Sequence, residues 1–219
     1  MRLGSRLRTG YARAVLRRIP GLVLGLILFG AGIALKLRSD LGLSPWDAFH
    51  QGLARHLPLS VGTVTILVGG LVLLAWIPLR QRVGVGTVLN AVVVGVIIDV
   101  TLYVVGDTES TPIRWAYLLG SIALIGVGSG LYIGSRLGPG PRDGVMMGLA
   151  ARGISIRLSR FLIEGTVLVA GWLLGATVGI GTVVFAIIIG PLVQFFLRLL
   201  DRGPISVVQS TPSASSSAS

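Results

Sequence analysis

The two halves of this 219-residue chain repeat one sequence pattern, and this repeat constrains the fold more than any other feature. Residues 41–54 read LGLSPWDAFHQGLA and residues 137–150 read LGPGPRDGVMMGLA, with seven of fourteen positions identical at a shift of 96. Residues 83–95, VGVGTVLNAVVVG, match 178–190, VGIGTVVFAIIIG, at seven of thirteen positions and a shift of 95. The repeat predicts two copies of one structural unit, which we place at 19–105 and 115–202.

The composition predicts a membrane protein. Only 12% of the residues are charged and the mean hydropathy is +0.86, whereas soluble domains carry about 25% charged residues. Apolar stretches long enough to cross about 30 Å of hydrocarbon recur near 19–35, 59–79, 83–105, 115–133, 161–178 and 179–200. We therefore expect an all-α polytopic membrane protein with six transmembrane helices.

The positive charges predict the orientation of these helices. Fifteen of the 19 Lys and Arg residues fall on one side of the expected membrane, and only Lys36, Arg38, Arg55 and Arg114 fall on the other. This bias predicts that both termini lie in the cytoplasm. The basic segment 1–18 is expected to bind anionic lipid rather than act as a transit peptide. The Ser-rich tail at 203–219 is expected to be disordered.

Three spans in each copy predict that the copies have opposite orientations. An odd number of spans makes the second copy enter from the other side, which gives a 3+3 inverted-topology repeat. Many secondary transporters, and some channels, use this plan. A duplication that left symmetry without transport remains the alternative.

A short extra helix is expected after the first span of each copy, at about 45–56 and 141–152. Each begins with a helix-cap motif, in which a carboxylate follows a proline at the first helical position. The motif residues are Ser44, Pro45 and Asp47 in the first copy and Gly140, Pro141 and Asp143 in the second. These helices are either re-entrant, with their N-termini directed at a central site, or amphipathic and placed on the membrane surfaces.

Several polar residues inside the expected spans are candidates for a solute or ion pathway. Glu164 is the strongest, because its counterpart in the other copy is Gly69; the alternative is a rim residue paired with Arg160. Asp99 and its counterpart Gln194 also fall within spans. The remaining candidates, which could equally hydrogen-bond between helices, are Asn90, Thr87 and Thr182.

The sequence lacks the usual signatures of catalysis and of cofactor binding. It has no cysteine, no P-loop, no HExxH motif and no G-x-S-x-G motif, and its histidines, His50 and His56, are not spaced as ligands on one helix face. We expect neither an enzyme nor a bound metal or cofactor. Nucleic acid is not an expected partner, because no soluble domain is available to bind it.

The repeated motifs resemble those of the bacterial YczE/YitT-type integral membrane proteins. The resemblance covers about 20–200 and favours the YczE branch, because the soluble C-terminal domain of the YitT branch is missing. It implies a bacterial inner-membrane location and supplies no substrate. The residues that carry it are Gly42, Pro45, Trp46, Asp47, Gly52, Gly84, Gly86, Thr87, Asn90, Gly95 and Asp99, with Glu164 and the Gly-x-Gly-Thr at 179–182.

The expected function is transport of an unknown small solute through the lipid bilayer, without an ATPase of its own. The alternatives are a membrane subunit that captures a small molecule for separate energising partners, and a non-transporting scaffold or regulator. Glycine-rich helix faces would also admit a homodimer.

The predicted topology can be tested with reporter fusions. Because residue 107 follows an odd number of spans, a fusion there should report the side opposite the cytoplasm, whereas a fusion at residue 203 should report the cytoplasm. A cytoplasmic signal from residue 107 would contradict the inverted arrangement.

Overall fold

The computed structural model describes residues 2–203, and within them all the regular structure is helical. The tail expected at 203–219 lies outside this range, apart from Gly203. The helices are α1 (Arg2–Ser39), α2 (Pro45–Ala54), α3 (Val61–Leu74), α4 (Trp76–Leu79), α5 (Val85–Val104), α6 (Thr111–Gly134), α7 (Pro141–Ala150), α8 (Ile156–Leu173) and α9 (Ile180–Leu200).

Five of the described segments are long and apolar enough to span a membrane: Val15–Ser39, Val61–Leu79, Val85–Val104, Thr111–Gly134 and Ile180–Leu200. The sixth expected span corresponds to α8, which is 18 residues long but carries three charges, Arg157, Arg160 and Glu164. The fold is therefore that of a polytopic helical membrane protein with five helices of clear spanning character. The expected stretches at 161–178 and 179–200 are indeed separate helices, because the chain leaves the helix between α8 and α9, where Gly175 and Gly179 lie.

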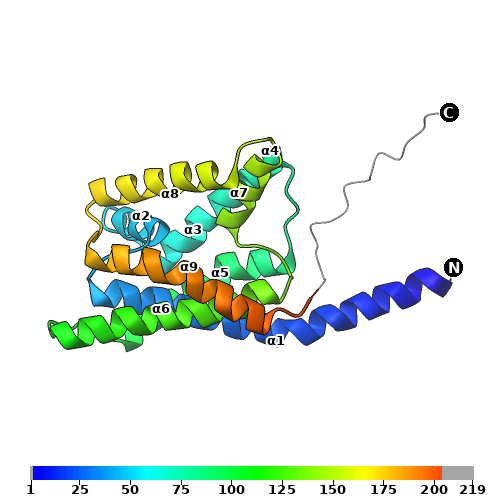
Figure 1. The fold of residues 1–219 in the computed structure, drawn as a ribbon, viewed down its shortest axis with the longest axis horizontal. Coiled ribbons are helices and arrows are strands. Elements are labelled where there is room, and N and C mark those ends of the chain that lie inside the picture. Colours follow the sequence, from blue (N-terminus) through cyan, green and yellow to red (C-terminus); the bar gives the residue numbers. More distant parts are fainter. Residues whose placement is uncertain (1, 204–219) are drawn as a thin grey trace.

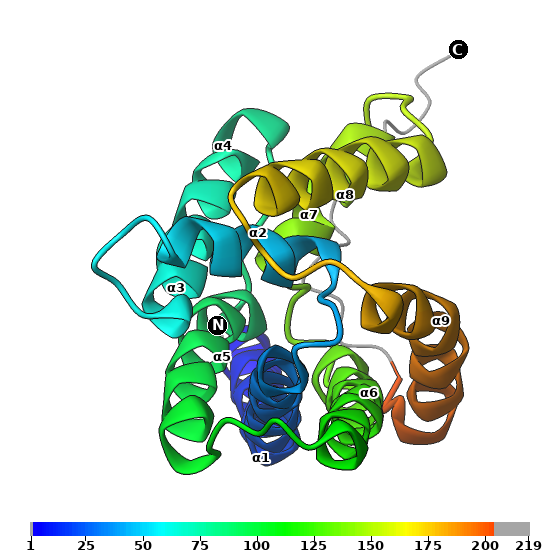
Figure 2. The ribbon, with the colours of Figure 1, turned by 90° about the vertical axis from the view of Figure 1, so that its left-hand side faces the viewer.

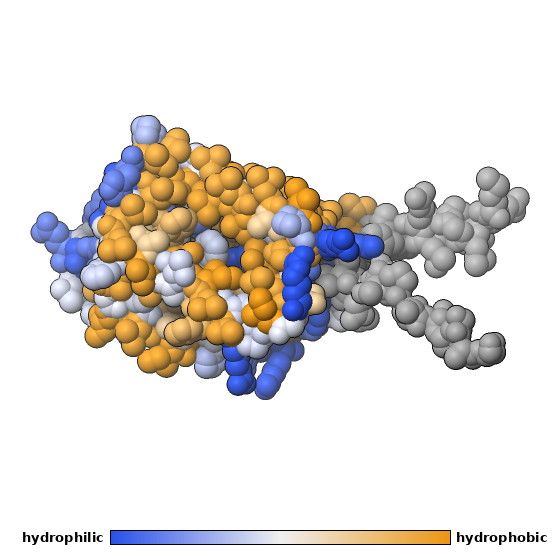
Figure 3. Space-filling model, turned by 90° about the horizontal axis from the view of Figure 1, so that it is seen from above, coloured by the Kyte–Doolittle hydropathy of each residue, from blue (hydrophilic) through white to orange (hydrophobic). Residues whose placement is uncertain are grey.

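Helices α1 and α6 lie side by side and form the middle of one layer of the bundle (Figures 1 and 2). Helix α5 packs beside α1, and α9 packs beside α6, while α2, α3, α7 and α8 form a second layer. Apolar side chains cover most of the face seen in Figure 3, with hydrophilic residues gathered toward its ends. Leu71, Ile187 and Phe195 are more than half exposed, as lipid-facing side chains are.

Glycines allow the central helices to approach closely. A Cβ atom added at Gly128 would lie 2.7 Å from the carbonyl oxygen of Gly25, so α6 and α1 touch through their backbones. On another face of α6, a Cβ atom at Gly130 would lie 2.8 Å from Cβ of Phe196 on α9. Small residues thus have the packing role that their spacing predicts.

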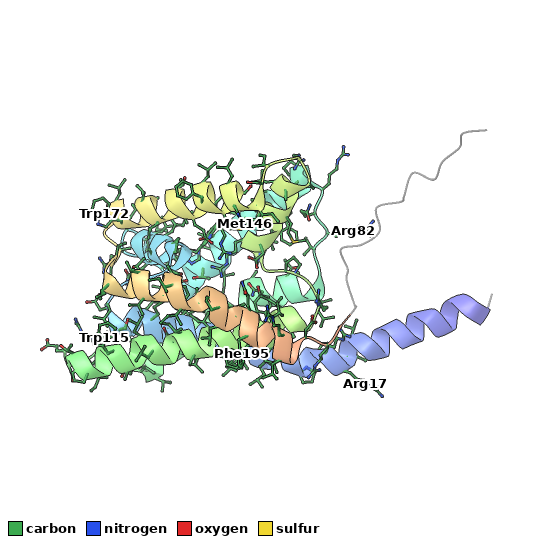
Figure 4. The ribbon with its side chains drawn as sticks, viewed as in Figure 1. Arg17, Arg82, Trp115, Met146, Trp172 and Phe195 are labelled. Atoms are coloured by element: carbon green, nitrogen blue, oxygen red, sulfur yellow. The ribbon has the colours of Figure 1, made fainter. Side chains whose placement is uncertain are left out.

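The two ends of the bundle carry separate polar networks. At the end where Figure 4 labels Arg17 and Arg82, Arg18 donates to the carbonyl oxygens of Ser135 and Gly203, both at 3.2 Å. Nearby, Arg136 donates to Asp201, and this hydrogen bond lowers the pKa of that carboxyl to about 2. These residues are brought to one end, as the charge pattern predicts.

The opposite end, where Figure 4 labels Trp115 and Trp172, has its own ion pairs. Arg38 pairs with Asp107, and Arg114 lies 3.6 Å from Asp40. The Thr177 hydroxyl donates to Asp40 at 2.8 Å. Residues from α1, α6 and the three loops that follow α1, α5 and α8 therefore meet here.

The loop that follows α1 packs on the start of α9, and the loop that follows α6 packs on the start of α5. Gly181 donates its backbone N–H to Leu41 O at 2.8 Å, and Gly86 donates to Leu137 O at 2.9 Å. The donors are 95 residues apart and the acceptors 96 apart, so repeated sequence makes repeated contacts. In each half of the chain, the start of a helix therefore binds a loop of the other half.

The loop glycines are required by these contacts. Gly42 and Gly138 both have φ of +134°, a region that side chains with Cβ rarely adopt. A Cβ atom at Gly42 would lie 2.7 Å from Oγ1 of Thr182, and one at Gly138 would lie 2.7 Å from Oγ1 of Thr87. No side chain fits at either position.

Replacing Gly42 should therefore weaken the contacts between the loop that follows α1 and the start of α9. Gly42→Ala is expected to destabilise the protein by roughly 1–3 kcal/mol, through backbone strain and the clash with α9. Gly120→Ala is the matched control, because its Cβ would meet only Leu35 Cδ1 at 3.8 Å. Thermal unfolding in detergent measures both; equal unfolding temperatures would contradict the account.

Candidate functional site

A cavity of about 70 Å³ lies where α2, α7 and four of the longer helices meet. Phe29 of α1 and Val94 of α5 line it, and each lies near the middle of its apolar span. The cavity therefore lies at the depth of the apolar, membrane-spanning parts of these helices. Its polar lining residues are Trp46, Asp47, His50, Thr65, Asn90, Tyr132, Arg142 and Asp143.

The two short helices are internal. Each has ten residues, and none of them is exposed. Ser44 and Gly140 occupy the N-cap positions, and the prolines that follow them begin the helices. Because both helices are covered by neighbours and both N-terminal turns line the cavity, the surface-helix alternative is wrong for this structure.

Asp47 is held by a buried ion pair rather than by the helix backbone. Its Oδ2 lies 2.7 Å from Nζ of Lys36, with side-chain exposures of 5% and 1% respectively. Ser44 also donates its hydroxyl to this oxygen, at 2.6 Å, so the Ser44 side chain does not cap the helix. The Lys36 ammonium lies 3.5 Å from the centre of the Phe185 ring, a cation–π contact.

The second copy has a related contact without the cation. Tyr132 donates its hydroxyl to Oδ2 of Asp143 at 3.1 Å. Tyr132 is 96 residues after Lys36, and Asp143 is 96 after Asp47. The two carboxylates are therefore held by equivalent positions, by a charged donor in one case and a neutral donor in the other.

Two buried rings beside the cavity have unused polar atoms. Trp46 and His50 are each 9% exposed, and neither Nε1 of Trp46 nor Nε2 of His50 has a hydrogen-bond partner among the described residues. The Thr65 hydroxyl donates to Val61 O at 2.8 Å, so it accepts from Nδ1 of His50 at 3.2 Å. This leaves Nε2 of neutral His50 as a free acceptor.

Arg142 lines the cavity with a guanidinium that has no ion pair or hydrogen bond with any residue in the described range. Its Cζ lies 5.9 Å from the centre of the Phe29 ring. The charge pattern had placed Arg142 among the loop cations on one side and Lys36 among those on the other. Both lie inside the protein instead. Of the other Lys and Arg residues, fourteen remain assigned to one side of the expected membrane and three to the other.

Only one of the predicted pathway residues lines the cavity, namely Asn90. Thr87 is fully buried and donates to Pro139 O at 2.8 Å. Thr182 accepts from the backbone N–H of Gly179 at 3.3 Å. Both threonines hold helix starts and loops in place.

The other three pathway candidates lie apart from the cavity. Asp99 accepts from the Gly62 N–H at 2.8 Å and from Ser60 at 2.5 Å, and so stabilises the start of α3. Glu164 is half-buried and pairs with Arg160 at 3.0 Å, the rim alternative considered above. Gln194 is exposed on α9.

Sequence reasoning did not identify Lys36, His50 and Arg142 as site residues. The available signal was the repeat itself, because positions 36 and 132 and positions 46 and 142 are equivalent and differ in charge. No group of three or more His, Asp or Glu within residues 2–203 could hold a metal ion.

The chain belongs to the YczE-type membrane protein family. It matches a family described as "Family of unknown function (DUF6198)" over residues 16–198. It is 38% identical over 189 residues to an uncharacterized protein of Haemophilus influenzae, covering 86% of this chain and 87% of that one. It is 36% identical over 177 residues to the uncharacterized membrane protein YczE of Bacillus subtilis, covering 79% and 82%.

A more distant relative, the uncharacterized protein YyaS of Bacillus subtilis, is 28% identical over 187 residues, with 82% of this chain and 92% of that protein covered. No solved structure matches the chain significantly.

The buried ion pair predicts a strong coupling between Lys36 and Asp47. Lys36→Met should cost about 3–5 kcal/mol, because it leaves a buried carboxylate without its cation. Arg160→Met, which breaks the more exposed pair, should cost less than about 1 kcal/mol. The double variant Lys36→Met/Asp47→Asn should be more stable than the sum of the single effects; additivity in a thermal-unfolding cycle would contradict the pairing.

Proposed function

We propose that this protein is a secondary transporter that moves a small polar solute across the bacterial inner membrane through the cavity between α2 and α7. One observation carries the proposal: the cavity in the apolar interior is lined by residues whose guanidinium, indole N–H and imidazole nitrogen have no partners within residues 2–203. Such groups are costly in a membrane protein unless they serve a ligand or a pathway.

The repeat supports a transport mechanism. We propose that α8 is the sixth span and that the copies form a 3+3 inverted repeat with both termini in the cytoplasm. The fourteen loop cations on one side agree with this orientation. The exchanged loops support it too, because equivalent contacts join each copy to the other.

The copies differ at the contacts that would change during transport. A Cβ atom at Gly171 of α8 would lie 2.5 Å from the Ala48 carbonyl carbon, so α2 and α8 touch closely. The residue equivalent to Gly171 is Trp76, a buried side chain whose Nε1 donates to Pro141 O at 2.8 Å. The bulk of Trp76 separates α7 from the end of α3.

This difference gives the two copies unequal conformations around one cavity. In inverted-repeat transporters, exchange of the two conformations opens the site first to one side and then to the other. We propose that α2 and α7, with α8 and the α3–α4 unit, exchange in this way.

Filling the cavity should stop transport without unfolding the protein. Gly69 of α3 lines the cavity, and a Cβ there would have nothing closer than 3.7 Å, so Gly69→Leu places its side chain into the space. Gly70→Leu is the matched control, because Gly70 is exposed and has nothing within 4 Å.

Proteoliposomes that contain only this protein should take up solute from a mixture of cell metabolites, as measured by mass spectrometry. Gly69→Leu should abolish that uptake and Gly70→Leu should retain it. Uptake that needs a co-purifying ATPase would instead support a capture subunit. Equal uptake by the two variants would place the pathway elsewhere.

A further inference from the structure

The cavity is lined by hydrogen-bond donors and by acceptors that lack partners among the described residues, and α2 and α7 each supply one of both kinds. Trp46 and Arg142 are equivalent positions of the two copies, and each is the second residue of its short helix. Both offer donors that no described residue accepts. A guanidinium presents its donors in a planar fork that matches a carboxylate.

The cavity also has acceptors without donors. Asp143 uses Oδ2 for the Tyr132 hydroxyl, and no described residue donates to its Oδ1. Nε2 of His50 is free because Nδ1 is the atom that faces Thr65. A ligand group that donates several hydrogen bonds, such as an ammonium, would satisfy these acceptors.

The charges around the cavity already sum to zero. Lys36 and Asp47 neutralise each other directly, at 2.7 Å. Arg142 and Asp143 carry opposite charges and yet form no ion pair with each other. A ligand with a net charge would leave an uncompensated charge in a medium of low dielectric constant, whereas a ligand that carries both charges would not.

We propose that the cavity binds a small zwitterion, an α-amino acid of about the size of glycine or alanine. Its carboxylate contacts Arg142 and the Trp46 N–H, and its ammonium contacts Asp143 and His50. The size follows from the volume of about 70 Å³, because one water needs roughly 10–15 Å³ measured in this way, which leaves room for about as many non-hydrogen atoms as glycine or alanine has. This inference rests on the proposed function in taking the cavity as the solute site.

Equilibrium binding to the purified full-length protein in detergent tests the ligand class without any transport. The probes are L-alanine and glycine, with acetate as the matched anion and methylammonium as the matched cation, followed by calorimetry at pH 7. At least one zwitterion should bind, and acetate and methylammonium should bind at least about 10-fold more weakly, which corresponds to one charge-assisted contact.

Two substitutions should change the preference in opposite directions. Arg142→Gln should weaken zwitterion binding by about 10- to 100-fold and improve binding of methylammonium relative to the zwitterions. Asp143→Asn keeps an acceptor for Tyr132 and should shift the preference toward acetate. Arg157→Gln, on the exposed start of α8, is the control and should bind as the unchanged protein does.

The outcomes separate this inference from the proposed function. Zwitterion binding without uptake into proteoliposomes would keep the site and overturn transport. Uptake of a different solute, with no zwitterion binding, would overturn the ligand class and keep transport. Acetate binding as tight as alanine binding, or unchanged zwitterion binding in Arg142→Gln, would overturn the inference.

Discussion

The buried contact between Lys36 and Asp47 determines how the rest of this structure is arranged. It ties the last turn of α1 to the first turn of α2, and so holds a helix too short to span the membrane inside the bundle. With its charges paired, α2 can pack under α8, and the space between α2 and α7 becomes a cavity in which a few polar groups lie among mostly apolar side chains. In an apolar medium, neither charge could remain there without the other.

The two copies have kept their interlocking contacts and changed residues that line the cavity or pack around it. The loop glycines, the threonines at helix starts and the backbone bonds between loop and helix occur in equivalent pairs. By contrast, Lys36 corresponds to Tyr132, Trp46 to Arg142 and Gly171 to Trp76. Symmetry is therefore retained where the halves hold each other. It is lost where a ligand or a conformational change would need two different surfaces.

A similar difference separates the helices at the edge of the bundle. Asp99 and Gly62 bring α3 close to α5, whereas their counterparts, Gln194 and Arg157, form no such contact between α8 and α9. Helix α8 packs on α2 instead. It carries three charges, and two of them, Arg160 and Glu164, pair with each other.

The sequence by itself determined the membrane class, the helix boundaries near 45, 141 and 180, and the doubling of the chain, because apolar length, proline position and repeated motifs are local signals. It could not identify the site. The charge pattern counted Lys36 and Arg142 among the loop cations. A polar residue in an apolar segment, such as Glu164, Asp99 or Gln194, does not reveal its partner or its place relative to the cavity. Only the tertiary structure decided which charges are paired across helices and which are left facing a cavity, since those pairs join residues from different helices.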